Sequence, residues 1–181
     1  NIVKKIPNKP LRIAFSFLSW NGLSSDFLHN QLTVGTSDGR IICYQANTNK
    51  MIFELKEKIE GDPQINAFDY SQDSSKILVV GAESNVRLYD VEKQTLLSNF
   101  SGNGMIPSHS NRVFACKFLP DQNLFVTSGW DQRILWWDIR TDTPHDSTHG
   151  TQIYGDGIDV KEGLLLACSF RDTKAIKLFT Y

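Results

Sequence analysis

The stretch that decides the fold is Thr127-Ser128-Gly129-Trp130-Asp131, followed after two polar residues by Ile134-Leu135-Trp136-Trp137-Asp138. The first part ends an apolar run that begins at Leu124, and the second is an apolar run that closes on an aromatic residue and an acid. Two short apolar runs that flank a polar turn predict a β-hairpin. This hairpin is the segment with which the rest of the chain can be compared.

The same pattern recurs along the chain, so that four units can be aligned. The aromatic position returns after 45, 48 and 42 residues, at Tyr44, Tyr89, Trp137 and Phe179. An acid stands in a turn six residues earlier in three units and seven residues earlier in the last: Asp38, Glu83, Asp131 and Asp172. Self-similarity at a nearly fixed period of this length indicates a repeat architecture in which each unit is one supersecondary structure.

Each unit is predicted to be a meander of strands. An apolar strand is expected ahead of each turn, over Gln31–Thr36, Lys76–Gly81, Leu124–Gly129 and Leu164–Ser169. A strand of alternating polarity comes before it, most clearly at Ile65–Tyr70 and Val113–Phe118, and a weaker outer strand is visible at Thr95–Phe100. The chain is therefore expected to be all-β.

Taken together, these units resemble the WD-repeat family of β-propellers over essentially the whole chain. The resemblance implies a β-propeller of four-stranded antiparallel blades. In that family a His, a Ser or Thr, an Asp and a Trp form a hydrogen-bonded network inside a blade, which here would be His109, Thr127, Asp131 and Trp137. The other units keep the turn acid but lack the His and the Trp, and Ser108 stands where the family favours Gly. We therefore expect one sturdy blade and three that depend more on packing.

The length predicts an incomplete ring. At about 45 residues per blade, 181 residues make about four blades, whereas propellers have roughly four to eight. The expected blades are 10–58, 59–104, 105–146 and 147–181, with 1–9 as the outer strand of a preceding or closing blade. The chain starts at Asn1 rather than Met and its last unit stops at Tyr181 without an outer strand, so a part of a larger ring is expected, with a closed four-bladed ring as the alternative. An open ring needs missing blades from the parent chain or a partner to cover its strand edges.

Composition excludes several classes of protein. With 19 Lys and Arg against 20 Asp and Glu, the net charge of −1 argues against a nucleic-acid partner. The apolar runs are far too short for a membrane span, so no membrane insertion is expected. Cys43, Cys116 and Cys168 match no ligand or redox spacing and are expected to be buried thiols of an intracellular, cytoplasmic protein, with cytoskeletal or nuclear association as an open alternative.

No catalytic constellation or phosphate-binding loop is found in the sequence. His145 and His149 are four residues apart, but Pro144 and Gly150 mark a loop and no third ligand is near, so no metal site is expected. The chain is therefore predicted not to be an enzyme and to need no cofactor.

Partner binding is expected at one edge of the ring. If the resemblance holds, the residue before each turn acid lies at the same edge in every blade: Ser37, Ala82, Trp130 and Arg171. A tryptophan in a turn exposes apolar area unless a partner covers it, or unless it folds over Arg112 or a neighbouring blade. The expected contact set is Arg112, Trp130 and Arg171, with Ser37 and with Trp20 from a longer loop of the first unit over 20–26.

Two functions follow from the resemblance. The favoured one is a non-catalytic scaffold that mediates protein–protein interactions within a larger intracellular assembly, including cytoskeletal or ciliary ones. The alternative rests on Trp137-Asp138-Ile139-Arg140, which is similar to the box by which many WD-repeat proteins dock, as substrate receptors, on the adaptor of cullin-RING ubiquitin ligases. Asp138 and Arg140 would then carry the polar contacts.

Overall fold

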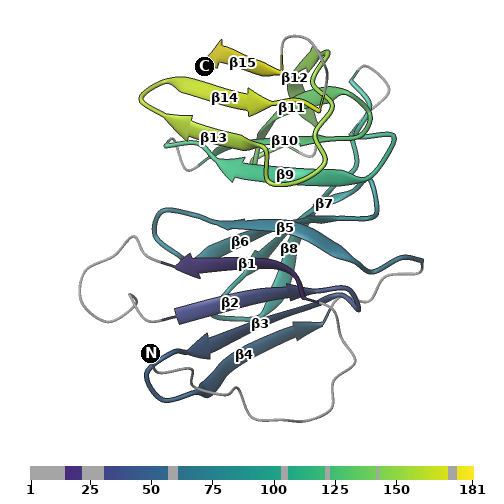
Figure 1. Ribbon diagram of the computed structural model, residues 1–181. Coiled ribbons are helices and arrows are strands. Elements are labelled where there is room, and N and C mark those ends of the chain that lie inside the picture. The colour runs from purple at the N-terminus through teal and green to yellow at the C-terminus, as the bar shows by residue number, and fades with distance from the viewer. Residues whose placement is uncertain are drawn as a thin grey trace.

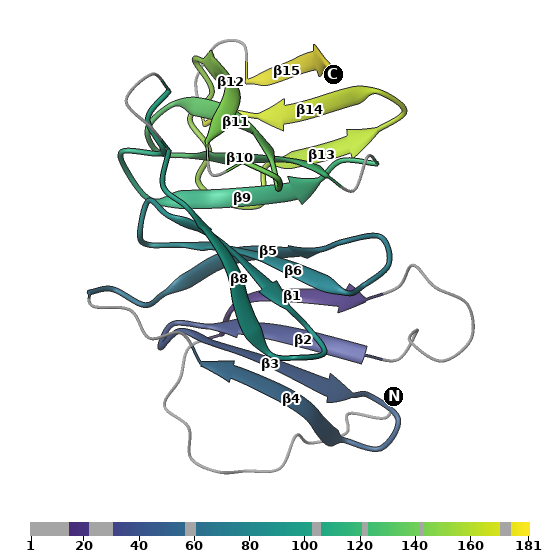
Figure 2. The ribbon, with the colours of Figure 1, turned by 180° about the vertical axis from the view of Figure 1, so that it is seen from behind.

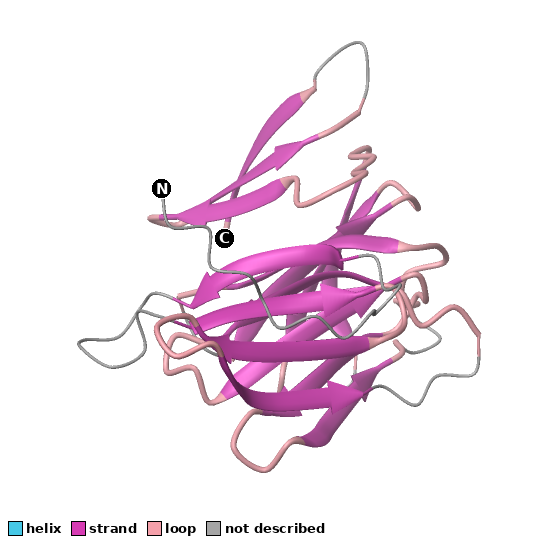
Figure 3. Cartoon of the chain, turned by 60° about the horizontal axis from the view of Figure 1, so that its bottom comes forward, coloured by secondary structure: helices cyan, strands magenta, loops and turns pink. Residues whose placement is uncertain are grey.

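The computed structural model describes residues 15–21, 31–56, 61–102, 106–120, 123–141, 143–170 and 175–181. Every regular element in these residues is a strand, and the strands form four antiparallel sheets that follow one another along the chain (Figures 1 and 3). Within this described part there is no helix long and apolar enough to cross a membrane. The expected all-β fold is confirmed.

The sheets contain fifteen strands in simple meander order. The first sheet comprises β1 (Phe15–Asn21), β2 (Gln31–Thr36), β3 (Arg40–Gln45) and β4 (Lys50–Lys56). The second comprises β5 (Ile65–Tyr70), β6 (Lys76–Gly81), β7 (Val86–Asp90) and β8 (Thr95–Phe100). The third comprises β9 (Val113–Phe118), β10 (Leu124–Gly129), β11 (Arg133–Asp138) and β12 (Pro144–His149). The fourth has three strands, β13 (Ile158–Lys161), β14 (Leu164–Cys168) and β15 (Ile176–Thr180).

The sheets are stacked as blades of an open ring. Both side views show the sheets in chain order from β1–β4 to β13–β15, with β1 beside β5 and β5 beside β9 (Figures 1 and 2). Each pair of consecutive sheets encloses its own apolar cluster. Leu55 and Phe68 belong to the cluster of the first pair, Phe100 and Trp137 to that of the second, and Ile134 to that of the third.

Within the residues that the structure describes, no further sheet covers the far face of the fourth sheet. Alternate residues of β14 are buried against the third sheet, whereas Leu164 and Leu166 point to the other side and are exposed. Ile176 and Leu178 of β15 are exposed as well. The four sheets therefore form part of a ring.

Three details differ from the sequence expectations. Pro144–His149, expected to be a loop, is the outer strand β12, because it pairs with β11. Trp20, expected in a loop, lies in strand β1, where its backbone pairs with Leu32. Cys43 and Cys116 are buried as expected, but Cys168 is exposed because it lies on the uncovered face of β14. Residues 1–9 lie outside the described residues, so the expectation of an outer strand there stays a prediction.

Candidate functional site

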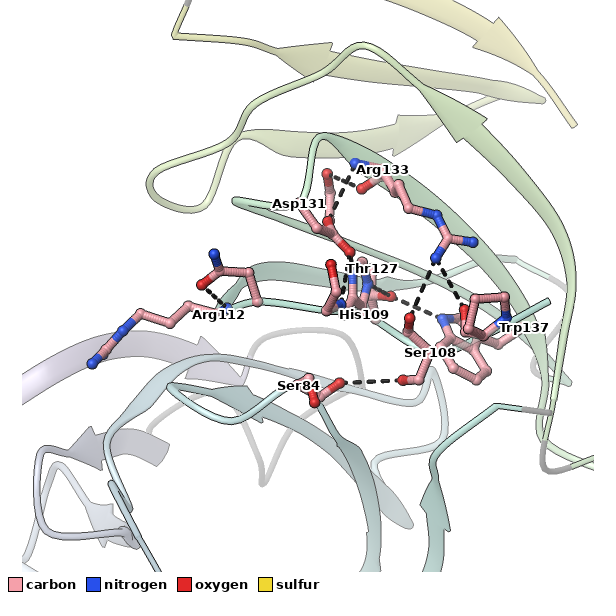
Figure 4. A network of polar contacts seen from close by, with 12 residues as sticks. Ser84, Ser108, His109, Arg112, Thr127, Asp131, Arg133 and Trp137 are labelled. Atoms are coloured by element: carbon pink, nitrogen blue, oxygen red, sulfur yellow. Dashed lines mark hydrogen bonds and ion pairs between the residues drawn. The ribbon is translucent and has the colours of Figure 1, made fainter. Parts of the chain in front are cut away.

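The third blade contains a chain of hydrogen bonds that joins four of its segments (Figure 4). The indole Nε1 of Trp137 donates to Thr127 Oγ1 at 2.8 Å. Thr127 Oγ1 lies 2.7 Å from Nε2 of His109, whose Nδ1 lies 2.8 Å from Asp131 Oδ2. All groups are satisfied when the Thr127 hydroxyl donates to Nε2 and the Nδ1 proton of His109 is donated to Asp131. The structure thus brings together the four residues that the family resemblance implied.

The acid of this network, Asp131, has a lowered pKa. Burial alone would raise the pKa of Asp131, but the hydrogen bond from His109 and the backbone amides of Ser110 and Arg133 keep it below its usual value. Ser108, which precedes His109, donates from Oγ to the carbonyl of Ser84 in the second blade at 3.2 Å. The network therefore holds the turn between β10 and β11, and its N-terminal segment also contacts the neighbouring blade.

The turns of the first and second blades use other partners for their acids. Asp38 accepts hydrogen bonds from Thr36 Oγ1 at 2.6 Å and from Arg40 Nε at 2.7 Å. Glu83 lies 3.8 Å from Arg87 in an ion pair. Because these acids are paired within their own hairpins, the turns are stabilised locally and do not tie a His-containing segment to the blade.

The same backbone hydrogen bond identifies equivalent positions at one end of three blades. The amide of Trp130 donates to Arg112 O at 3.0 Å, and that of Ala82 donates to Gln64 O at 2.9 Å. In the fourth blade the corresponding bond runs from Phe170 N to Gln152 O at 2.8 Å. The position before the turn therefore belongs to Phe170 in the fourth blade, whereas the sequence spacing assigned it to Arg171, which lies outside the described residues. We call the edge formed by Ser37, Ala82, Trp130 and Phe170 the turn rim.

Aromatic side chains continue from one blade to the next along this rim. Trp130 stacks on Phe114 of its own blade, with ring centroids 5.2 Å apart and planes at 28°. It also contacts Tyr154 of the fourth blade, at 5.2 Å, and Tyr154 contacts Phe170 at 5.1 Å. We call Phe114, Trp130, Tyr154 and Phe170 the aromatic row. Trp130 packs on a neighbouring blade, as one of the two alternatives expected, and exposure increases along the row to 46% at Tyr154 and 78% at Phe170.

Arg112 is paired with an acid in the segment before β5. Its Nη2 lies 2.9 Å from Asp62 Oδ2, and Figure 4 shows its side chain extending away from the His109 network. Ser37 lies in the turn between β2 and β3, at the same rim. Trp20 lies on strand β1 and not in the turn between β2 and β3. Of the expected contact set, the structure therefore brings Ser37 and Trp130 to the turn rim and pairs Arg112 with the preceding segment.

Asp138 and Arg140 occupy the opposite end of the third blade, because the β11–β12 turn and the β10–β11 turn lie at the two ends of β11. The guanidinium of Arg140 donates to both carboxylate oxygens of Asp138, and the backbone amide of Arg140 donates to Asp138 Oδ1 at 2.9 Å. These contacts hold the pKa of Asp138 at about 2. The two residues are paired with each other on a surface separate from the turn rim.

An acid–base–acid group links the first strands of the blades. Lys117 of β9 lies 4.0 Å from Asp69 of β5 and 3.7 Å from Asp156, which precedes β13. Burial raises the pKa of Asp69 to about 6, although Lys117 and the amide of Phe118 act against that rise. Sequence reasoning missed this group, because its members are 39 or more residues apart in the chain.

No set of three metal-ligating side chains is brought together in the described part of the chain. His145 and His149 lie on strand β12 rather than in a loop: His149 pairs with Arg133 of β11, and His145 lies at a register shift between the paired Pro144 and Asp146. Sequence reasoning also missed Tyr154 and Phe170. Phe170 could have been found by aligning Leu164–Ser169 with Leu124–Gly129, because this alignment gives Phe170 the position that Trp130 has in the third unit.

Comparisons with known proteins agree with this geometry. Residues 100–138, which contain the His109 network, match the family described as "WD domain, G-beta repeat". Residues 29–106 match the "Anaphase-promoting complex subunit 4 WD40 domain". The chain belongs to the WD-repeat family.

Curated relatives of this WD-repeat chain are matched over part of their length. Protein Rae1 of Drosophila melanogaster is 24% identical over 117 residues, which are 64% of this chain and 32% of the relative. WD repeat and SOCS box-containing protein 1 of Xenopus tropicalis is 32% identical over 60% of this chain and 24% of its own length. Echinoderm microtubule-associated protein-like 4 of Xenopus laevis is 28% identical over 60% of this chain and 11% of its own length. The chain thus spans about a third or less of these relatives.

Solved structures show the same fold. A structure titled "Structure of U3-55K" matches with a TM-score of 0.76 at 11% identity, over 97% of this chain and 51% of that one. A chain of the "Crystal Structure of Mitotic Checkpoint Complex" matches with a TM-score of 0.76 at 12% identity, over 97% of this chain and 50% of that one. The WD-repeat chain therefore corresponds to about half of each of these solved chains.

Proposed function

We propose that this WD-repeat chain is a non-catalytic scaffold that binds partner proteins through the turn rim, as part of a larger intracellular assembly. The observation that carries the proposal is the aromatic row, which ends on Tyr154 and on Phe170, 78% exposed. Exposed aromatic side chains on a rigid β framework are typical of the residues that dominate binding energy in protein interfaces. The strands behind the rim hold the row in place, so little ordering is needed when a partner binds.

The charges near the rim support a binding role rather than a catalytic one. Asp131 is bound to His109, and Arg112 is paired with Asp62. A general acid or base must exchange its proton with a substrate, but the side chain of His109 is buried and both of its ring nitrogens are bonded, to Asp131 and to Thr127. With a net charge of −1, we also propose that the partners are proteins rather than nucleic acids.

The kind of assembly is proposed from the relatives and from the open ring. The similarity to a microtubule-associated protein-like relative supports a cytoskeletal or ciliary assembly, and the similarity to an mRNA export factor, GLE2 of Chaetomium thermophilum, keeps nuclear association as an alternative. The uncovered face with Leu166 and Leu178 supports contact with further blades, from the parent chain or from a partner.

The alternative function is a substrate receptor that docks on a cullin-RING ligase adaptor through Asp138 and Arg140. The side chain of Arg140 is 67% exposed, so its outer surface is open to a partner even though it is paired with Asp138. Because this pair lies at the opposite end of the blade from the turn rim, the two functions use separate surfaces.

Affinity purification of the intact parent protein from its own cells tests both functions. Phe170→Ala should remove a defined set of structural partners, whereas Arg140→Ala, a matched exposed substitution at the other end of a blade, should leave that set unchanged. If cullin-ligase components dominate, survive Phe170→Ala and are lost with Arg140→Ala, the scaffold function is wrong and the receptor function replaces it.

A further inference from the structure

A groove of about 270 Å³ lies at the end of the aromatic row, between the 153–157 loop and the end of β14. Its walls include Tyr154 and Phe170, and Asp156 lies among its lining residues. Two residues without side chains, Gly155 and Gly157, complete the loop, and no heavy atom lies within 4 Å of a Cβ placed on Gly155. The groove is therefore open and has aromatic, carboxylate and backbone surfaces.

The aromatic walls form a corner. The rings of Tyr154 and Phe170 are inclined at 59°, and both are exposed. Gln152 Nε2 donates to the hydroxyl oxygen of Tyr154 at 2.7 Å, which fixes the orientation of that ring. The face of an aromatic ring carries negative charge density, so the exposed parts of these two rings can attract a cation placed against them.

The charge of the groove is negative. Asp156 lies 3.7 Å from Lys117, but Lys117 is shared with Asp69 at 4.0 Å. Asp159 adds a further negative charge that raises the pKa of Asp156, after burial as the main cause. Among these described groups, three carboxylates face one ammonium group, so a second cation would be attracted to Asp156.

We propose that this groove binds the cationic side chain, arginine or lysine, of a partner polypeptide, with its charged group against Tyr154 and Phe170 and paired with Asp156. This inference rests on the proposed scaffold function and names the chemistry of the partner. A neutral apolar side chain would desolvate the Asp156 carboxylate and leave it only Lys117, which it shares with Asp69, and an anion would be repelled by it. Arginine fits best, because a planar guanidinium can stack on a ring and bind a carboxylate with two nitrogens.

Titration of the full chain with blocked glycine pentapeptides tests this proposal. The central residue is arginine, lysine, citrulline or norleucine, and binding is followed by the tyrosine, tryptophan and phenylalanine resonances. The arginine and lysine peptides should bind at least about tenfold more tightly than the uncharged citrulline and norleucine peptides. Equal binding of the arginine and citrulline peptides, or no binding of any of the four, would overturn the proposal.

Substitutions locate the site. Asp156→Asn should weaken arginine-peptide binding about tenfold, and Phe170→Leu, which keeps apolar bulk but not the ring, should weaken it severalfold. Asp146→Asn, an exposed aspartate on β12 outside the groove, is the matched control and should leave binding unchanged. Circular dichroism confirms that each variant is folded.

The outcomes separate this inference from the scaffold function. If Asp156→Asn binds the arginine peptide like the wild type while Phe170→Ala still removes partners from the purified parent protein, the cation site is wrong and the scaffold function stands. If Asp156→Asn weakens peptide binding while Phe170→Ala leaves the set of co-purified partners unchanged, the cation site stands and the turn rim is not the scaffold surface.

Discussion

Replacement of Trp137 by alanine is expected to remove much of the stability of the third blade. Trp137 is fully buried, stacks on Phe125 with ring centroids 5.8 Å apart and planes at 8°, and meets the edge of Phe100 at 5.7 Å. Truncation of a buried aromatic residue of this size costs about 3–5 kcal/mol. The lost donor to Thr127 adds little, because the Thr127 hydroxyl still bonds to His109 at 2.7 Å.

The assay is urea unfolding followed by circular dichroism. With a slope of about 2.5 kcal/mol per molar urea for a chain of this size, Trp137→Ala should lower the midpoint by about 1 to 2 M. Trp137→Phe, which keeps a ring on Phe125, should fall between the wild type and Trp137→Ala. Phe170→Ala is the control, since it removes an aromatic ring that is 78% exposed, and it should move the midpoint by about 0.2 M or less. A shift below about 0.5 M for Trp137→Ala at an unchanged slope would refute the reasoning.

Three further predictions follow. Asp131→Ala should lower the free energy of unfolding by about 1–3 kcal/mol, because the buried His109 that donates to Asp131 is left without its acceptor. Asp38→Ala removes a more exposed ion pair and should lower the free energy of unfolding by about 1 kcal/mol or less. Equal losses for the two variants in urea unfolding would contradict the special role of the third blade. Because burial raises the pKa of Asp69 to about 6, above an unfolded value of about 3.9, stability should be lost as the pH rises from about 4 through 6. The wild type should therefore lose stability relative to Asp69→Asn between about pH 4 and 6.5 and change little relative to it above about pH 7; a constant difference across this range would exclude this linkage. Of the three cysteines, only the exposed Cys168 should react rapidly with a thiol reagent in the native state, whereas all three should react in denaturant. Rapid labelling of all three thiols in the native state would contradict the burial of Cys43 and Cys116.

The inner strands and the turns were predictable from the sequence. Ile65–Tyr70, Val113–Phe118 and Leu124–Gly129 are strands with the expected bounds, because an apolar pattern between turn residues specifies both the strand and its buried face. The outer strand β12 was not predictable in this way. Its sequence, Pro144-His-Asp-Ser-Thr-His149, is mostly polar, and it becomes a strand by pairing with β11 in a hairpin.

Parts of the candidate site depend on information that a single sequence does not contain. The acid of the fourth unit is one residue out of step, so alignment on acids selected Arg171, whereas the backbone bond from Phe170 to Gln152 sets the position. Cys168 is exposed because no sheet of the described residues covers the far side of β14, which local sequence does not encode. Pairing of Lys117 with Asp69 and Asp156 requires the packing of three consecutive blades.

Site-specific photo-crosslinking of the intact parent protein in its own cells tests the scaffold function most directly. A photoreactive phenylalanine analogue is placed singly at Ala82 and Phe170 on the turn rim, and at Arg140 on the opposite end of the third blade. We predict that the two rim positions crosslink the same partner proteins and that the Arg140 position does not. Crosslinks to partner proteins from Arg140 alone would contradict binding through the turn rim.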